Sequence, residues 1–170
     1  RIKAAVDVSA GQVYSNGVWL AKDGYLIEDA TVPTLERIES TAQALADFKT
    51  KHKGMKMSFL LAPNAVSVYE DKLPLTVEAK DQNRYIDRMF TDTERAGYIN
   101  IDVRETFEKN ADMTQLYYYT DHHWTTDGAK LAFDAAAEKL GLAGVEFELL
   151  PVANRFVGTL ASKSGFANGK

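Results

Sequence analysis

The chain has 170 residues, of which 45% are hydrophobic and 26% are charged, which suits one well-buried domain over residues 1–170 and argues against a disordered chain. The formal net charge of −4 argues against a nucleic-acid partner, because no surplus of Lys and Arg is available to bind phosphates. The absence of cysteine excludes disulfides, a thiolate nucleophile and Cys-ligated zinc.

Neither a transmembrane segment nor a signal sequence is predicted. No apolar run approaches the roughly 18 residues of a membrane span, and the chain does not open with a charged and then apolar stretch. Arg1-Ile2-Lys3 at the start and Asn168-Gly169-Lys170 at the end read as cuts within a longer protein. We therefore expect the remainder of the domain to lie beyond residue 170.

The first half of the chain alternates short extended segments with helices. Asp23-Gly24, between two apolar runs, is a hairpin signal. Apolar residues at helical spacing predict a helix from Pro33 to Lys51 and a second from Val77 to Thr91. Extended segments are predicted at residues 13–14, 18–20, 25–27 and 55–62, the last of which runs into Pro63-Asn64.

The second half repeats this alternation. A strand is predicted at 98–103, a short helix at 104–110, an extended segment at 116–119 and a last strand at 147–152. A third long helix follows Trp124. Either Thr125 or Thr126 can cap it, and Gly141 can close it.

Strands that alternate with amphipathic helices predict an α/β domain with a mainly parallel central sheet. Ligands of such sheets bind beyond the carboxyl ends of the strands. Because Pro63-Asn64 and residues 121–123 both follow predicted extended segments, we expect them to converge on one cleft.

Asp121 and His123 are the strongest catalytic candidates. If residues 117–123 are extended, the two side chains project to the same side with Cα atoms about 7 Å apart. The Asp121 carboxylate can then orient the imidazole through Nδ1, which leaves Nε2 free to take a proton from a nucleophile. The same alternation predicts that His122 points away from His123 and has a structural role.

A metal site is the competing interpretation, because Asp-x-His can also present two ligands to a cation. The remaining histidine, His52, lies between Lys51 and Lys53, and these cationic neighbours disfavour a metal there. We therefore predict no bound metal and no other cofactor.

The nucleophile is the missing part. None of the serines lies in a Gly-Asp-Ser or Gly-x-Ser-x-Gly turn that would lift a hydroxyl toward a base. Ser162 and Ser164 are the least unfavourable, and their Ala-Ser-Lys-Ser-Gly setting is more typical of a turn or a ligand-binding loop.

Three further residues are candidates for substrate or oxyanion contacts. Asn64 follows a predicted strand and can donate its amide to an oxyanion, although a loop asparagine often bonds its own backbone. Trp124 can shield the pair from water, and Tyr119 can stack on a sugar ring or pack within the sheet.

Residues 118–129, Tyr-Tyr-Thr-Asp-His-His-Trp-Thr-Thr-Asp-Gly-Ala, resemble the signature of the bacterial DHHW proteins, relatives of the alginate O-acetyltransferase group within the SGNH-hydrolase-like superfamily. Residues 21–27, 63–74 and 156–165 are similar to other segments of those proteins, in the same order. Asn64-Ala65 departs from the Asn-Lys of that group, so any role of the lysine does not carry over.

This resemblance implies a three-layer α/β fold of the SGNH-hydrolase type, incomplete in this chain. It also implies a Ser-His-Asp triad in which Asp121 and His123 act with a serine from a later turn. The implied activity is transfer or removal of acetyl groups on a bacterial exopolysaccharide or cell-wall glycan, with a protein or small molecule as acyl donor. The implied location is outside the cytoplasm, secreted or anchored at the cell surface.

The missing serine keeps two alternatives open. A non-catalytic polysaccharide-binding or assembly module would keep the fold and the aromatic residues without a nucleophile. A metal-dependent hydrolase would use Asp121 and a histidine as ligands. We expect this chain by itself to be inactive.

Overall fold

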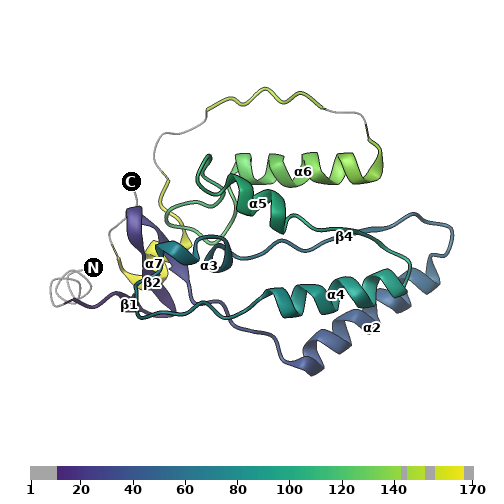
Figure 1. Cartoon of the computed structure of the whole chain (residues 1–170), viewed down its shortest axis with the longest axis horizontal. Coiled ribbons are helices and arrows are strands. Elements are labelled where there is room, and N and C mark those ends of the chain that lie inside the picture. Colours follow the sequence, from purple (N-terminus) through teal and green to yellow (C-terminus); the bar gives the residue numbers. More distant parts are fainter. Residues whose placement is uncertain (1–10, 143–144, 152–155, 167–170) are drawn as a thin grey trace.

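The computed structural model describes residues 11–142, 145–151 and 156–166 of the chain (Figure 1). Strands β1 (Tyr14–Ser15), β2 (Val18–Leu20) and β3 (Leu26–Glu28) form an antiparallel sheet in the order β1-β2-β3. Asn16 and Gly17 both have positive φ, as a tight hairpin turn requires. The 3-10 helix η1 (Lys22–Gly24) joins β2 to β3, so the predicted Asp-Gly connection is confirmed.

A second sheet consists of β4 (Ser58–Leu60) and β5 (Ile99–Ile101), which pair in parallel. Helices α2 (Leu35–Lys51) and α4 (Asn83–Arg95) lie together on one side of this pair. Helices α5 (Arg104–Asn110) and α6 (Thr126–Leu140) lie on the other side (Figure 1). The α/β layering is therefore confirmed, while parallel pairing within the described residues is confined to two strands.

The start of the second predicted helix and the last predicted strand differ most from the prediction. Helix α4 begins at Asn83 rather than at Val77, and the Asp81 carboxylate accepts a hydrogen bond from the Asn83 backbone N–H at this new start. The predicted strand at 147–152 is wrong for residues 147–151, which have no regular secondary structure. Leu149 and Leu150 are exposed there, without a neighbouring strand to cover them. Val152 lies outside the described residues.

The core fixes the segment that leads into Asp121. Tyr69, Phe107 and Leu116 are fully buried in one cluster between the layers. The Tyr69 hydroxyl accepts a hydrogen bond from the Leu116 backbone N–H at 2.8 Å, and the Tyr117 hydroxyl donates to the Pro63 carbonyl. The ends of two chain segments, at Pro63 and at Tyr117, are thereby held together.

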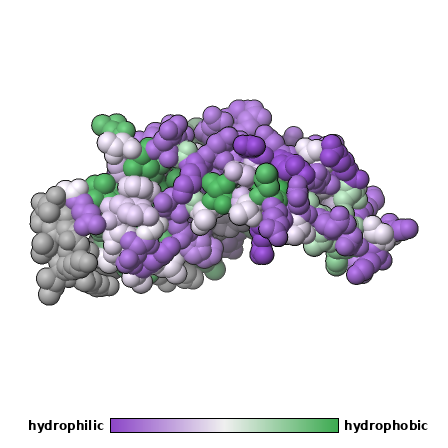
Figure 2. Space-filling view, turned by 90° about the horizontal axis from the view of Figure 1, so that it is seen from below, coloured by the Kyte–Doolittle hydropathy of each residue, from purple (hydrophilic) through white to green (hydrophobic). Residues whose placement is uncertain are grey.

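Three short helices complete the described fold: α3 (Ala65–Val68), the 3-10 helix η2 (Glu70–Lys72) and α7 (Thr159–Ser164). Figure 1 places α3 and α7 beside the antiparallel sheet. The face shown in Figure 2 is mainly hydrophilic, with small separate hydrophobic patches. Within the described part of the chain, no helix has the length and apolar character needed to cross a membrane.

The start of α6 is closed by hydrogen bonds, as predicted. The Thr125 hydroxyl caps the helix by accepting from the Gly128 backbone N–H at 3.1 Å, and Gly141 closes it in the left-handed conformation. Gly128 also lies so close to the preceding segment that an added Cβ would be 2.5 Å from the Leu116 carbonyl oxygen. No side chain larger than hydrogen fits at this contact without movement of the backbone.

The substitution Gly128→Ala is therefore expected to lower the free energy of unfolding by about 1–3 kcal/mol, the usual cost of overpacking. Urea denaturation measures this difference. Gly54→Ala is the matched control, because a Cβ at Gly54 would meet no atom within 4 Å. Equal stability of the two variants would contradict the tight contact at Leu116.

Candidate functional site

The loop between Tyr117 and Trp124 carries the candidate site. These two residues form an antiparallel bridge, and the Tyr118 backbone N–H donates to the His123 carbonyl at 3.2 Å. The intervening residues bend back instead of continuing as a strand. The extended conformation considered for residues 117–123 is therefore wrong for residues 119–123.

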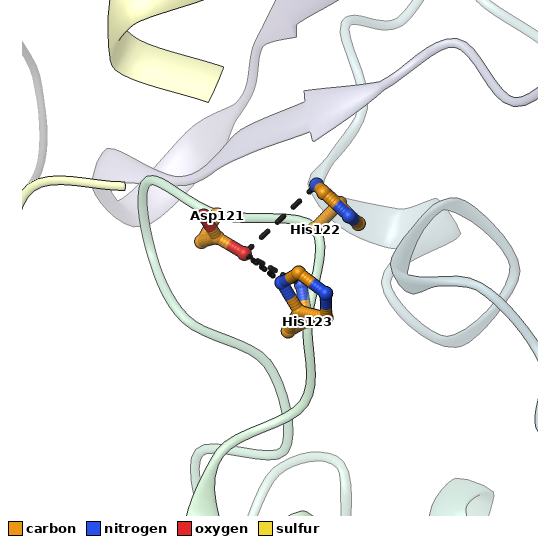
Figure 3. A group of neighbouring side chains, drawn as sticks. All are labelled: Asp121, His122 and His123. Atoms are coloured by element: carbon orange, nitrogen blue, oxygen red, sulfur yellow. Dashed lines mark hydrogen bonds and ion pairs between the residues drawn. The ribbon is translucent and has the colours of Figure 1, made fainter. Parts of the chain in front are cut away.

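Asp121 is at the centre of this loop, with only 5% of its side chain exposed. One carboxylate oxygen, Oδ1, accepts from the His123 backbone N–H at 3.0 Å and lies 2.5 Å from His123 Nδ1. The other oxygen, Oδ2, accepts from the backbone N–H and the hydroxyl of Thr159 at 2.8 and 2.9 Å. Figure 3 shows the carboxylate facing the imidazole of His123.

These hydrogen bonds keep the carboxylate ionised. Burial alone would raise the pKa of Asp121, but the donors from Thr159 and His123 outweigh burial and hold the pKa well below its usual range. At neutral pH Asp121 is consequently an anion that can only accept hydrogen bonds.

His123 is oriented by this anion. Since Asp121 can only accept, Nδ1 of His123 donates to it, and Nε2 is left as the unprotonated nitrogen of the neutral ring. The His123 side chain is 67% exposed, so Nε2 can be reached by a reacting group. The predicted contact between Asp121 and His123 is present, although a bend of the main chain, and not strand alternation, brings the two side chains together.

The prediction that His122 faces away from His123 is wrong. The two imidazole centroids lie 4.0 Å apart with the rings tilted by 35°, and both rings lie on the same side of Asp121 (Figure 3). His122 Nδ1 is 3.2 Å from the Thr159 hydroxyl. The bend at residues 121–123 removes the alternation on which that prediction depended.

The three side chains have the composition of a metal site, with ligand atoms of Asp121, His122 and His123 within 4.8 Å of one another. Their spacing suits a hydrogen bond better. Two ligands of a tetrahedral zinc lie about 3.3 Å apart when each bond is about 2.0 Å. Asp121 Oδ1 and His123 Nδ1 are 2.5 Å apart. His52 lies at the end of α2 with its ring on Phe48, and it is not part of this group.

Asn64 shares a cavity with His122 of this loop, whereas Asp121 and His123 do not line it, so the expected convergence is met only through His122. Asn64 immediately precedes α3 and, with His122, lines a small cavity of about 50 Å³. Tyr119 and Trp124 do not line that cavity. The Tyr119 ring packs on Tyr25 at 4.4 Å, and the Trp124 ring packs on the buried Phe107 at 6.2 Å.

The described serines do not complete a triad. Ser164 is buried in α7, where its hydroxyl donates to the Leu160 carbonyl at 2.7 Å, and Ser162 is exposed on the same helix. Among residues 11–142, 145–151 and 156–166, no serine forms a hydrogen bond with His123.

Gly158 and Thr159 are the residues of this site that the sequence did not single out. A Cβ at Gly158 would lie 2.4 Å from Asp121 Cβ, so glycine allows the two segments to approach. Thr159 supplies both donors to Asp121 Oδ2. A Gly-Thr pair at the start of a short helix is a common sequence, and the contact between Thr159 and Asp121 joins residues 38 positions apart.

Residues 18–165 match the family model described as the SGNH hydrolase-like domain, acetyltransferase AlgX. The chain belongs to this family. The match confirms the predicted SGNH-like fold and the relationship to the alginate acetyltransferases, whereas membership of the DHHW group stays a prediction. A search of curated proteins gave no significant match.

Solved structures share the fold. The O-acetyltransferase domain of Pseudomonas putida AlgJ is 22% identical, with a TM-score of 0.63 over 86% of this chain and 58% of that one. Bacillus cereus PatB1 with a sulfonyl adduct is 22% identical, with a TM-score of 0.58 over 76% and 45% of the two chains. A further PatB1 structure is 24% identical, with a TM-score of 0.54 over 70% and 40%. The chain thus spans 58% or less of the length of each.

The substitution Asp121→Asn should destabilise the protein in a pH-dependent manner. Asparagine has one acceptor oxygen in place of two, so donors are left unpaired and the free energy of unfolding at pH 7 falls by about 1–3 kcal/mol. Because the folded-state pKa of Asp121 is depressed, the wild type loses this stabilisation as the pH falls below about 4.

Urea denaturation at pH 7, 5 and 3 should therefore show a gap between wild type and variant that narrows at pH 3. Glu138→Gln, at an exposed position of α6, is the control for the loss of one carboxylate. A gap for Asp121→Asn that keeps its full size at pH 3 would contradict the ionised, multiply bonded carboxylate.

Proposed function

We propose that this domain belongs to an enzyme that transfers acetyl groups to, or removes them from, hydroxyls of a bacterial exopolysaccharide or cell-wall glycan outside the cytoplasm. The observation that carries the proposal is the exposed imidazole of His123 held through Nδ1 by the buried, ionised Asp121. Membership of an acetyltransferase family supports the acyl group, and the polysaccharide substrate follows from the resemblance described above.

The nucleophile in this proposal is a serine outside the chain, brought to His123 Nε2. Nε2 takes the serine proton while Oγ attacks the acetyl carbonyl carbon, and the resulting imidazolium is stabilised by Asp121. The imidazolium then gives its proton to the leaving group of the donor, which leaves an acetyl-serine. A sugar hydroxyl, or water in an esterase, attacks this ester as Nε2 takes its proton, and the proton returns to the serine.

Asn64 is the oxyanion candidate in this scheme. It lines the small cavity beside His122, and its side-chain amide can donate to the oxygen that becomes negative in the tetrahedral intermediate. The scheme requires no metal and no organic cofactor. The acyl donor is either a partner protein or a small acyl ester or thioester.

The direct test is labelling of the full-length protein by an alkyl or aryl sulfonyl fluoride, a reagent class chosen because one PatB1 structure carries a sulfonyl adduct. His123→Ala should reduce the labelling rate by about 10²–10⁴-fold, the usual contribution of a general base. His52→Ala should label at the wild-type rate, because His52 is an exposed residue at the end of α2.

Equal labelling of wild type and His123→Ala would contradict the proposal.

A non-catalytic polysaccharide-binding module is the second candidate, because no described serine bonds to His123. That alternative predicts no labelling of the full-length protein and retention of glycan binding, and acetyl transfer or release by the full-length protein would exclude it.

A further inference from the structure

Thr159 lies within hydrogen-bonding distance of two polar side chains of the site, Asp121 and His122. Its backbone N–H and hydroxyl lie 2.8 and 2.9 Å from Asp121 Oδ2, and the same hydroxyl oxygen lies 3.2 Å from His122 Nδ1. The hydroxyl has one proton and an ionised carboxylate has none, so the proton points to Asp121. The lone pairs of Thr159 Oγ1 are then left to accept from His122, which requires the proton of the neutral ring to be on Nδ1.

We propose that Thr159 is a positioning residue of this site, which fixes the carboxylate of Asp121 for His123 and sets the tautomer of His122. The effect of Thr159 on catalysis depends on the function proposed above. Its effect on the orientation of Asp121 and on the tautomer of His122 does not. A carboxylate turns readily about its last side-chain bond. With two donors on each oxygen, Asp121 has a single orientation in which Oδ1 meets His123 Nδ1.

The hydroxyl has a separate role from the attachment of α7. The Gly158 and Leu160 backbone N–H groups donate to Thr120, at 2.9 Å to its hydroxyl and 3.0 Å to its carbonyl. Leu160 is buried in a cluster with Val18, Leu26 and Phe166. These contacts hold the helix in place without the Thr159 side chain, so loss of the hydroxyl changes the site while α7 stays attached.

Among the described residues, no group forms a hydrogen bond with Nε2 of either histidine. In this hydrogen-bond arrangement, His122 Nδ1 donates to Thr159 Oγ1, and the Thr159 hydroxyl donates to Asp121 Oδ2. His123 Nδ1 donates to Asp121 Oδ1. Two imidazoles, 44% and 67% exposed, therefore lie side by side, each with an unprotonated Nε2. This arrangement requires a hydroxyl at position 159, because a methyl group can neither donate nor accept a hydrogen bond.

Nitrogen-15 NMR of the imidazole rings, recorded on the chain at a pH at which both rings are neutral, tests the proposal. The variants are Thr159→Val, which has nearly the same shape without the hydroxyl, and Thr159→Ser, which keeps it. In wild type and Thr159→Ser, His122 should carry its proton on Nδ1. In Thr159→Val that population should fall at least about threefold, because the acceptor is lost.

Amide spectra check that each variant is folded, and Thr159→Ala is the second variant if valine disturbs the fold. An unchanged His122 tautomer in a folded Thr159→Val or Thr159→Ala protein would overturn the proposal. So would a Thr159→Ser protein that behaves like Thr159→Val.

Kinetics of the full-length protein separate this inference from the proposed function. Thr159→Val should lower kcat for acetyl transfer about 10-fold with little change of KM, and Thr159→Ser should stay within about twofold of wild type. If the tautomers change as predicted while the wild-type protein transfers no acetyl group, the positioning by Thr159 stands and the proposed function fails. A kcat that is unchanged in Thr159→Val would overturn the catalytic part of the inference.

Discussion

The site depends on one buried carboxylate that stays ionised. Removing a charge from water costs several kcal/mol unless hydrogen bonds replace the solvent. Asp121 obtains these bonds from His123 in its own loop and from Thr159, which lies 38 positions further along the chain. The same anion that needs these donors gives His123 its tautomer, so the stability of the loop and the chemistry of the imidazole have one physical cause.

A few contacts around the site keep the Asp121 loop and the Thr159 segment together. The bridge between Tyr117 and Trp124 closes the loop, and the Thr125 cap fixes the start of α6 directly after it. Gly158 allows α7 to approach Asp121 at a distance that no side chain would permit. The Tyr117 hydroxyl donates to the Pro63 carbonyl, and this contact holds Asn64 beside the small cavity that His122 also lines.

The sequence predicted the parts of the site that depend on local chemistry. An Asp two residues before a His, followed by a Thr that caps a helix, indicates the Asp121–His123 contact and the boundary of α6. The predicted orientation of His122 was wrong, because the chain bends at residues 121–123 where an extended segment was expected. Thr159 could not be found, because its partner is distant in sequence. The strand expected at 147–152 is not formed by residues 147–151, because hydrophobicity alone does not supply a neighbouring strand.

In the proposed mechanism, His123, held by Asp121, is the base for a serine nucleophile. A crystal structure of the full-length protein after reaction with a sulfonyl fluoride tests it most directly. We predict a sulfonylated serine whose Oγ lies within about 3.5 Å of His123 Nε2, while Nδ1 keeps its bond to Asp121. An adduct on a residue remote from His123, or a His123 ring turned away from Asp121, would contradict it.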